Sequence, residues 1–324
     1  FRSVAALSAL ELAQQIASDN IDVLIDLSGF TEGNRLLTFA LKPAALQMSW
    51  IGFVGTTGLQ QMDYYIAHDH LMAPGELDAI FTEKLVSLPS AKIFEYSSVA
   101  PEVGKLPALK NGYLTLGNFN RPQKLTPAIL DCWAKILRTL PHARLLFAYM
   151  DDERMIDSYR VEMTRRGVNP EQLDFRMKQS FADYLAMHNE VDILLDSHPY
   201  SAGTTAQHAC WMGVPLVTTT EGSAVSRTTA ATMKTFNLGE FVTASLDEYA
   251  EKVIELDRRY DCLSAIRQSL RARIKQREAS HSHNAVYFEQ MIETVWQRHQ
   301  AGEAPSALFI EDQHRWDEQH DVIK

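Results

Sequence analysis

Residues 192–218 constrain the fold of this chain more than any other stretch. The short apolar run at 193–195 predicts a buried strand, and Gly203 begins a helical pattern that Gly213 is placed to end. Residues 214–217 then predict a second buried strand. A strand, a helix and a strand in this order form a βαβ unit, so the sequence predicts an α/β fold with a parallel sheet.

The start of this helix is a candidate anion site. A helix N-terminus carries free N–H groups and a partial positive charge, which suits a phosphate. The hydroxyls of Thr204 and Thr205 would add donors there, although Thr is also common at helix starts that bind nothing. His208 follows on the same helical face, where it is either a ligand contact or a structural residue.

Composition limits the class of protein. With 324 residues, 46% hydrophobic and 22% charged, the sequence is typical of a soluble globular protein of two domains. We find no apolar run long enough to span a membrane and no secretory signal. The net charge of −10 argues against a general nucleic-acid binder. The widely spaced Cys132, Cys210 and Cys262 predict neither a disulfide framework nor a zinc site, and fit a reducing cytoplasm.

The first part of the chain, residues 1–107, predicts an α/β unit. An amphipathic helix at 7–18 precedes apolar strands at 21–27 and 46–51, and a glycine-bearing loop follows each strand. Ligands of such sheets bind at these strand ends. The second loop, 52–58, holds three glycines, which permit a close backbone approach, and a plain surface turn is the alternative.

A second α/β unit is expected at residues 108–280. The prolines within 97–111 predict a linker before it. Lys124 follows the strand expected at 113–116 and precedes a helix start, where it is either a cation for a phosphate or a surface lysine. Tyr184 lies on a later helix, where it is either a base-stacking aromatic or a core residue.

The two ends of the chain carry further expectations. Residues 281–324 predict a last amphipathic helix and a charged, mobile tail. The chain opens at Phe1 directly into a helical pattern, so we interpret it as a fragment whose first domain is incomplete. The basic clusters at 165–166 and 271–277 are expected to be solvated helix faces.

Several motifs taken together resemble a known family. They are Gly29-Phe30-Thr31, residues 39–58, Asn118-Phe119-Asn120 with Lys124, Gly203-Thr204-Thr205 and residues 211–215. Their order and spacing are similar to the catalytic region of the O-linked N-acetylglucosamine transferases and SPINDLY-type proteins, family forty-one of the glycosyltransferases. The resemblance implies a GT-B fold, with two Rossmann-like domains facing across a cleft, and a preceding array of tetratricopeptide repeats that recruits protein substrates.

The resemblance also implies roles in donor binding. Lys124 matches the lysine that neutralises the donor diphosphate, and Gly203, Thr204 and Thr205 match the helix start that holds its phosphates. Asn120 would be a further contact in the cleft. A lysine and a helix N-terminus can stabilise a leaving diphosphate without a metal, so neither metal nor cofactor is expected.

Other positions match the family pattern less closely. Thr56 would contact the cleft from the glycine loop, and Asp19 falls at an acidic residue near the acceptor but also fits a helix-end cap. Val54 replaces the usual proline of the loop. His208 stands where the family carries an acidic residue on the donor ribose, which leaves the donor open. The family's histidine near the acceptor would lie upstream of Phe1.

We therefore expect an inverting, metal-independent protein O-glycosyltransferase that moves a sugar, first of all N-acetylglucosamine, from a UDP-sugar to Ser or Thr. Transfer of fucose from GDP, or of glucose onto Asn, are alternatives, as are an epimerase of the same fold and a non-catalytic nucleotide-sugar-binding scaffold. A nicotinamide dehydrogenase is disfavoured because the sequence lacks the Gly-x-Gly-x-x-Gly fingerprint after a strand. The expected partners are a nucleotide sugar and a protein or peptide acceptor, without nucleic acid or membrane.

Overall fold

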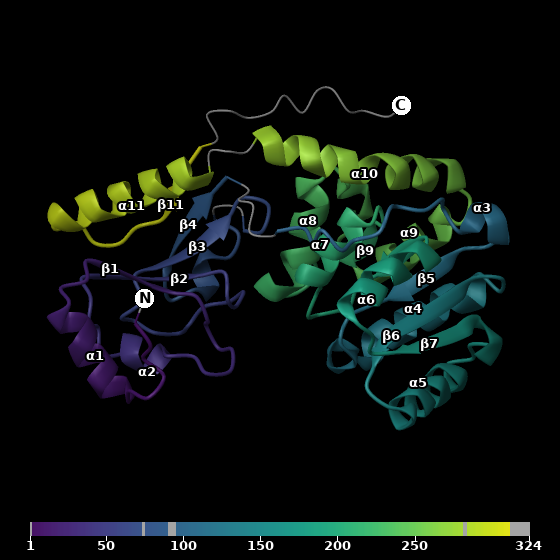
Figure 1. Cartoon of the computed structure of the whole chain (residues 1–324), viewed down its shortest axis with the longest axis horizontal. Coiled ribbons are helices and arrows are strands. Elements are labelled where there is room, and N and C mark those ends of the chain that lie inside the picture. Colours follow the sequence, from purple (N-terminus) through teal and green to yellow (C-terminus); the bar gives the residue numbers. More distant parts are fainter. Residues whose placement is uncertain (1, 73–74, 90–94, 281–283, 312–324) are drawn as a thin grey trace. The chain divides into compact units, whose positions relative to one another are not determined.

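The chain divides into two compact units in the computed structural model (Figure 1). One unit comprises Phe1–Ala91 and Ser282–Lys324, and the other Lys92–His281. The structure describes residues 2–72, 75–89, 95–280 and 284–311. Each unit contains a parallel sheet with helices, which confirms the predicted α/β class.

The sheet of the first unit is parallel throughout its described strands, in the order β1-β2-β3-β4-β11. These strands are β1 (Val23–Asp26), β2 (Leu46–Trp50), β3 (Tyr64–His68), β4 (Lys84–Leu88) and β11 (Leu308–Phe309). The helices are α1 (Ala9–Ser18), α2 (Leu36–Phe39), η1 (Asp78–Ile80) and α11 (Asn284–Gln300). Ser8 begins α1 with a capping box to Glu11, as its place before an amphipathic pattern favours.

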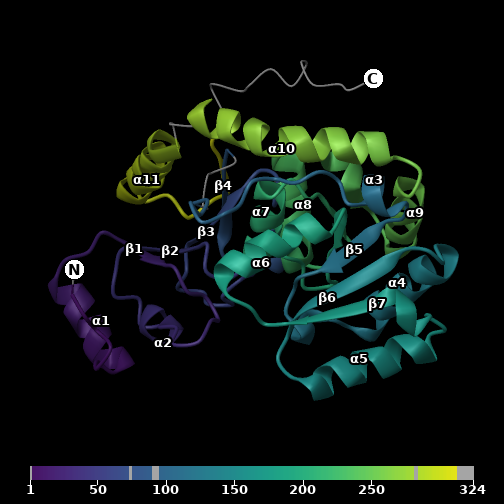
Figure 2. The same ribbon diagram turned by 45° about the vertical axis from the view of Figure 1, so that its right-hand side comes forward.

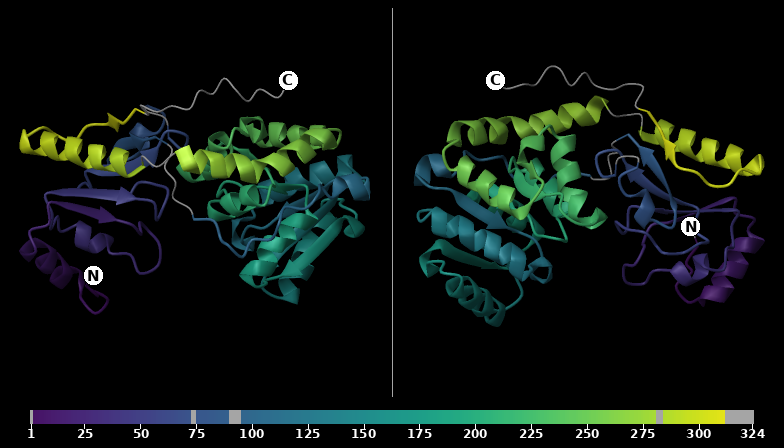
Figure 3. Two further views of the ribbon diagram at one scale, coloured as in Figure 1. Left: turned by 45° about the horizontal axis from the view of Figure 1, so that its top comes forward. Right: turned by 180° about the vertical axis from the view of Figure 1, so that it is seen from behind.

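The last helix belongs to the first unit and is not a separate C-terminal part. Its side chains Tyr287, Met291 and Val295 are spaced by four residues and buried in the core of the first sheet. Figure 3 shows α11, in yellow, along the strands of that sheet. The tail expected after it also enters the sheet, because Leu308 of β11 pairs with Val86 of β4. Residues 312–324 of that tail lie outside the described residues.

The sheet of the second unit has the strand order β10-β9-β8-β5-β6-β7. Its strands are β5 (Thr115–Asn118), β6 (Arg144–Met150), β7 (Leu173–Met177), β8 (Ile193–Leu195), β9 (Leu216–Thr219) and β10 (Val242–Thr243). Its α-helices are α3 (Ala108–Asn111), α4 (Pro127–Thr139), α5 (Glu153–Arg165), α6 (Phe181–Met187), α7 (Thr204–Trp211), α8 (Thr228–Thr235), α9 (Leu246–Leu256) and α10 (Tyr260–Ser280). Its short 3₁₀ turns are η2 (Pro122–Lys124), η3 (Pro170–Gln172), η4 (His188–Glu190), η5 (Ala224–Arg227) and η6 (Gly239–Phe241).

This order is that of a dinucleotide-binding fold. Numbered along the unit, the strands run 3-2-1-4-5-6, so the direction of winding reverses between β5 and β8. Right-handed crossovers then place the helices on both faces of the sheet. On one face of the sheet α4 packs against α9, and on the other face α7 contacts α8 and α10. Figure 2 shows α10 running past α7 and α8. The carboxyl ends of β5 and β8 therefore border the crevice where such sheets bind ligands.

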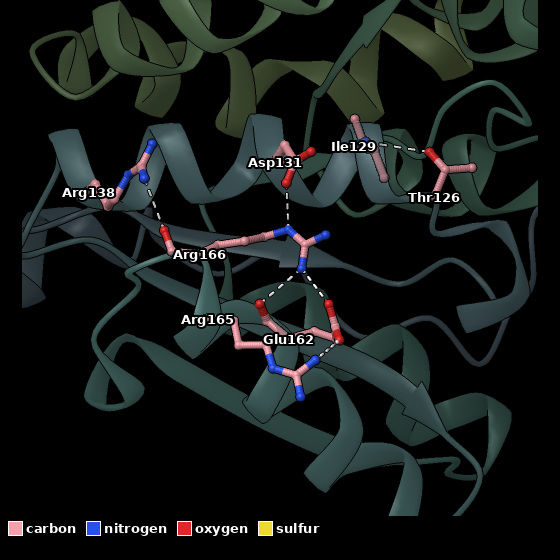
Figure 4. Close-up of polar contacts among 7 residues, drawn as sticks. All are labelled: Thr126, Ile129, Asp131, Arg138, Glu162, Arg165 and Arg166. Atoms are coloured by element: carbon pink, nitrogen blue, oxygen red, sulfur yellow. Dashed lines mark hydrogen bonds and ion pairs between the residues drawn. The ribbon is translucent and has the colours of Figure 1, made fainter.

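An arginine ties α4 to α5 beside this sheet (Figure 4). Arg166 donates from Nε to Asp131 Oδ1 over 2.6 Å and from Nη1 to Glu162 Oε2 over 2.6 Å. Only 18% of its side chain is exposed, whereas Arg165 is 71% exposed. The basic cluster at residues 165–166 is thus only partly exposed to solvent.

The boundary between the units lies before residue 95 and not at 107. Tyr96 stacks on Trp211 of α7 with 4.2 Å between ring centroids. Further on, Gly104 N donates to Asn189 Oδ1 over 2.8 Å and Gly104 O accepts from Arg267 Nε over 2.9 Å. The segment expected as a linker is irregular up to residue 106 and ends in α3, and these long-range contacts fix it to the second unit.

The second basic cluster is also partly buried. Arg271 of α10 exposes 14% of its side chain and donates to the carbonyl oxygens of Trp211 and Pro101 over 2.7 and 2.8 Å. Its guanidinium lies 5.0 Å from the centre of the Trp211 ring. The expectation of a solvated face is therefore wrong for Arg271, because the side chain is used to hold α7 and the segment around Pro101.

Candidate functional site

The switch point of the second sheet gathers the main predicted donor residues. Asn120 and Lys124 follow β5, and Gly203 with the two threonines follows β8, the adjacent strand. Lys124 Nζ donates to the carbonyl oxygen of Ser201 over 2.9 Å. The structure thus brings Lys124 to the loop that begins α7, although the two lie far apart in the sequence.

Several contacts hold Lys124 in this place. Its ammonium lies 4.3 Å from the centre of the Tyr200 ring. Thr126, the N-cap of α4, donates its hydroxyl to His198 O over 2.9 Å and so fastens the start of α4 to the same loop. Burial lowers the pKa of Lys124, the Asp196 carboxylate opposes this shift, and Arg121 adds to it. A partly desolvated cation at this point favours an anionic ligand.

The start of α7 lies at the residues where the sequence predicted a helix start. The helix begins at Thr204 after Gly203. The N–H groups of its first residues have no carbonyl acceptor within the helix. Thr204 is exposed. The loop before it is anchored, because Ser201 donates its hydroxyl to Val225 O over 2.7 Å and Thr228 donates to Ala202 O over 2.9 Å.

Tyr184 and His208 meet in a group of rings beside this loop. The Tyr184 hydroxyl lies 3.4 Å from His208 Nδ1 and also hydrogen-bonds the side chain of Thr205. The Tyr184 ring lies 6.1 Å from Phe119 and 6.1 Å from Phe181 between centroids. Tyr184 packs against the core and reaches the site residues with its hydroxyl, so the core interpretation and the site interpretation are compatible.

The histidines of this group are held uncharged. Burial lowers the pKa of His208 to about 4 and that of His188 to about 3. His188 is fully buried, and its Nδ1 donates to Tyr184 O over 3.0 Å. A neutral His208 can offer a hydrogen bond to a hydroxyl, which is the chemistry of a sugar or ribose.

His188 makes the second unit sensitive to acid. Its pKa is lowered on folding, so the unfolded chain binds more protons below about pH 6.5, and stability falls as the pH falls towards 3. Between pH 7 and pH 5 we expect a loss of about 2 kcal/mol from this residue. Urea unfolding at the two pH values measures the loss, and His188→Asn, which keeps a donor near Nδ1, is expected to reduce it. An equal loss in the variant would contradict the assignment to His188.

In the first unit, the loops that follow β1 and β2 touch each other. A Cβ on Gly52 would lie 2.1 Å from Leu27 O, and one on Gly29 would lie 2.4 Å from Phe53 Cβ. The rings of Phe30 and Phe53 meet edge to face with 5.6 Å between centroids. Gly52 therefore serves a close approach to the backbone of the loop after β1, whereas Gly58 has open space and a φ of +72°, as in a turn.

Among the described residues, no three His, Cys, Asp or Glu side chains gather as a metal site. Within the same residues, no helix combines the length and the apolar composition needed to cross a membrane.

The comparison with known proteins now decides the family. Residues 6–96 and 105–291 match the model of glycosyl transferase family 41. The chain belongs to this family. It is 32% identical to a protein of Solanum lycopersicum and 30% identical to one of Arabidopsis thaliana, both named probable UDP-N-acetylglucosamine–peptide N-acetylglucosaminyltransferase SPINDLY. Each match covers 96% of this chain and 34% of the relative, so the chain spans about a third of the length of these relatives.

Solved structures agree with a family 41 fold. An O-GlcNAc transferase mutant from Thermobaculum terrenum is 33% identical, with a TM-score of 0.79 over 93% of this chain and 57% of that one. An Anabaena protein, solved with UDP and glucose, shares the fold at 14% identity, with a TM-score of 0.52 over 89% of this chain and 81% of that one. The predicted GT-B class with two Rossmann-like domains is confirmed.

Two of the residues implied by family 41 lie in the first unit. The Thr56 hydroxyl donates to Glu83 Oε2 over 2.6 Å and accepts from the N–H groups of Gly58 and Thr82 over 3.0 and 3.2 Å. Asp19 is the C-cap of α1, and its carboxylate accepts from Arg2 and Gln15. Asp19 precedes β1 and so lies at the amino edge of the sheet, away from the strand ends that bind ligands. These contacts account for both side chains structurally, and their roles toward a ligand stay predictions.

Sequence reasoning missed Asp196, the residue at the centre of the family 41 switch point. It is 1% exposed, directly follows β8 and accepts hydrogen bonds from Ser197, Ala202 and Thr218. A charged residue immediately after a buried apolar strand was the signal that could have found it. Tyr200, whose ring lies beside Lys124, had no such signal.

Proposed function

We propose that this chain is the catalytic region of an inverting glycosyltransferase that moves N-acetylglucosamine from UDP-N-acetylglucosamine to Ser or Thr of a protein. The observation that carries the proposal is Lys124, held by Ser201 O beside the start of α7 at the switch point. A cation and a helix N-terminus at one place suit a diphosphate. The names of the relatives and their identity to this chain support the same donor and acceptor.

The proposed reaction has a simple charge balance. The acceptor hydroxyl oxygen forms a bond to the anomeric carbon as the bond from that carbon to the diphosphate oxygen breaks, and the hydroxyl proton passes to a base. UDP leaves with an added negative charge, which Lys124 and the N–H groups at the start of α7 would stabilise. No metal is needed for this, so we propose a metal-independent transfer. We propose Asp19 as the acidic residue on the acceptor side.

The donor contacts follow from the same geometry. Residues 203–205 would hold the phosphates, Asn120 would line the crevice, and His208 would offer its neutral imidazole to the ribose. Tyr184 would stack near the base, and Thr56 stays a proposed donor contact. Because His208 stands where the family carries an acidic residue on the donor ribose, a GDP-sugar is the main alternative donor.

We propose a protein or peptide acceptor, recruited in the whole protein by tetratricopeptide repeats, and a reducing cytoplasm as its location. Cys132, Cys210 and Cys262 are all free thiols, which supports a reducing compartment. The net charge of −10 gives no support for a nucleic-acid partner.

Ligand-dependent thermal unfolding tests the proposed donor. A nucleotide at about a hundred times its dissociation constant adds roughly 2.7 kcal/mol to the stability of the chain that binds it. We expect UDP and UDP-N-acetylglucosamine to raise the unfolding temperature, with GDP and NAD as controls. A shift with GDP alone would favour the fucose-type alternative, and a shift with none would contradict donor binding by this chain. Sugar turnover on a peptide then separates a transferase from a scaffold, and product analysis without acceptor separates it from an epimerase.

A further inference from the structure

The Asp196 carboxylate connects three segments of the switch point. Its Oδ1 accepts from Ser197 N over 2.9 Å and from Ala202 N over 2.8 Å, and its Oδ2 accepts from Thr218 Oγ1 of β9 over 2.7 Å. From the segment after β5, Asn120 Nδ2 approaches Oδ1 at 3.4 Å. The loop between Ser197 and Ala202 is thus folded around one carboxylate.

A buried charge at this point needs a reason beyond stability. Burying a carboxylate costs several kcal/mol, and such groups are often replaced by neutral ones without loss of stability. Burial raises the pKa of Asp196, whereas its donors and the charge of Lys124 lower it. The hydrogen bonds from N–H and hydroxyl donors are those of a carboxylate.

Lys124 and Asp196 are linked through neighbouring residues of one loop. The described acceptor of Lys124 Nζ is Ser201 O, and the neighbouring amide of Ala202 is fixed by Asp196 Oδ1. The groups that face Lys124 are Asp196, Arg121 and the Tyr200 ring. Asp196 favours the charged ammonium, and Arg121 disfavours it.

We propose that Asp196 is a positioning residue of the donor site, which shapes the loop that orients Lys124 and keeps its ammonium charged for the diphosphate. The inference rests on the proposed function, because it assigns Asp196 a task within the same site. Asp196 itself, a negative group, is not expected to contact the phosphates.

A second buried aspartate supplies the matched control. Asp192 precedes β8 at the opposite end of the strand and accepts from Ala108 N and Thr115 N over 2.8 and 2.7 Å. It is fully buried, and burial raises its pKa to about 6. Asp192→Asn therefore removes a buried charge of the same strand without touching the site.

Calorimetric titration with UDP between pH 7.5 and pH 10 tests the proposal, since the diphosphate is fully charged in this range. The part of the affinity due to charged Lys124 is present below its pKa and is lost as the pH rises through it. Asp196→Asn removes the charge that raises this pKa, so we expect the loss to begin at lower pH. We then expect the variant to bind UDP about tenfold more weakly than the unchanged chain at high pH. Asp196→Glu is expected to restore the profile, and Asp192→Asn to leave it unchanged.

The double variant shows whether Asp196 acts through Lys124. In a Lys124→Met background, Asp196→Asn is expected to cause no pH-dependent change in UDP affinity. An unchanged profile in Asp196→Asn, or an equal change in Asp192→Asn, would overturn the inference. If circular dichroism shows that the Asn variant does not fold, Asp196→Ser carries the same test. Absence of UDP and GDP binding by the unchanged chain would instead overturn the proposed function.

Discussion

Replacing Lys124 with methionine is expected to weaken UDP binding roughly tenfold to a hundredfold. The ammonium lies at the start of α7, and a hydrogen bond to a charged group contributes about 1.5 to 3 kcal/mol. By the usual relation between free energy and Kd, this loss gives the stated factor. Methionine keeps most of the length of the side chain, so the fold is expected to persist. Isothermal titration of both chains with UDP at pH 7.5 measures the change.

Lys135→Met is the matched control for this substitution. Lys135 lies on α4 with 45% of its side chain exposed and pairs with Asp247 over 2.8 Å. Removal of an exposed pair of this kind changes stability little and leaves the switch point intact. Equal UDP affinities for Lys124→Met and Lys135→Met would remove Lys124 from the donor site.

The parts of the fold that were predicted correctly are those with local signals. The helix start at Thr204 was recognised because Gly and Thr precede an apolar pattern, and Gly213 follows the helix with a φ of +74°. Val214 N donates to Ala209 O over 2.8 Å, which closes this helix end as its glycine favours. Such features depend on a few neighbouring residues, so the sequence alone determines them.

Other elements depend on distant partners. Only part of the 21-residue helix α10 was recognised, as the helix face at 271–277, because its arginines obscure its apolar stripe, and Arg267 and Arg271 are covered by segments far away in the chain. Strand β7 alternates apolar and polar residues over only five positions, and its place beside β6 comes from pairing. The strand order, and with it the switch point, is likewise a property of the folded chain.

In the candidate site, too, the residues with a motif were recognised and those that depend on distant contacts were not. The sequence and the resemblance named Lys124 and the α7 start, which the structure brings together. Asp196 was passed over because a single aspartate after a strand has no family motif of its own. Thr56 was named for a ligand, yet its hydroxyl is engaged by Glu83, a pairing across 27 positions that no local pattern indicates.

The second large effect is expected for Arg267→Met, which should destabilise the second unit by about 3 to 5 kcal/mol. Arg267 is 1% exposed and donates to the carbonyl oxygens of Gly104, Val191 and His188 over 2.9, 2.8 and 2.9 Å. Burial lowers its pKa to about 10, and the charge of Asp192 opposes this shift. Methionine fills much of the space but offers no donor, so three carbonyl groups lose their partner and a buried carboxylate loses its nearby cation.

Hydrogen exchange of the amides in β5 and β8 can assign this loss to the second unit, because the two units need not unfold together. Arg258→Met is the control, since Arg258 is exposed between α9 and α10 and is expected to change stability by less than about 0.5 kcal/mol. Because Arg267 holds Gly104 and the residues before β8, its loss should also speed exchange at Gly104 N, which donates to Asn189. Equal exchange in the two variants would mean that the segment 95–107 is held by the Tyr96 stack on Trp211 and not by Arg267.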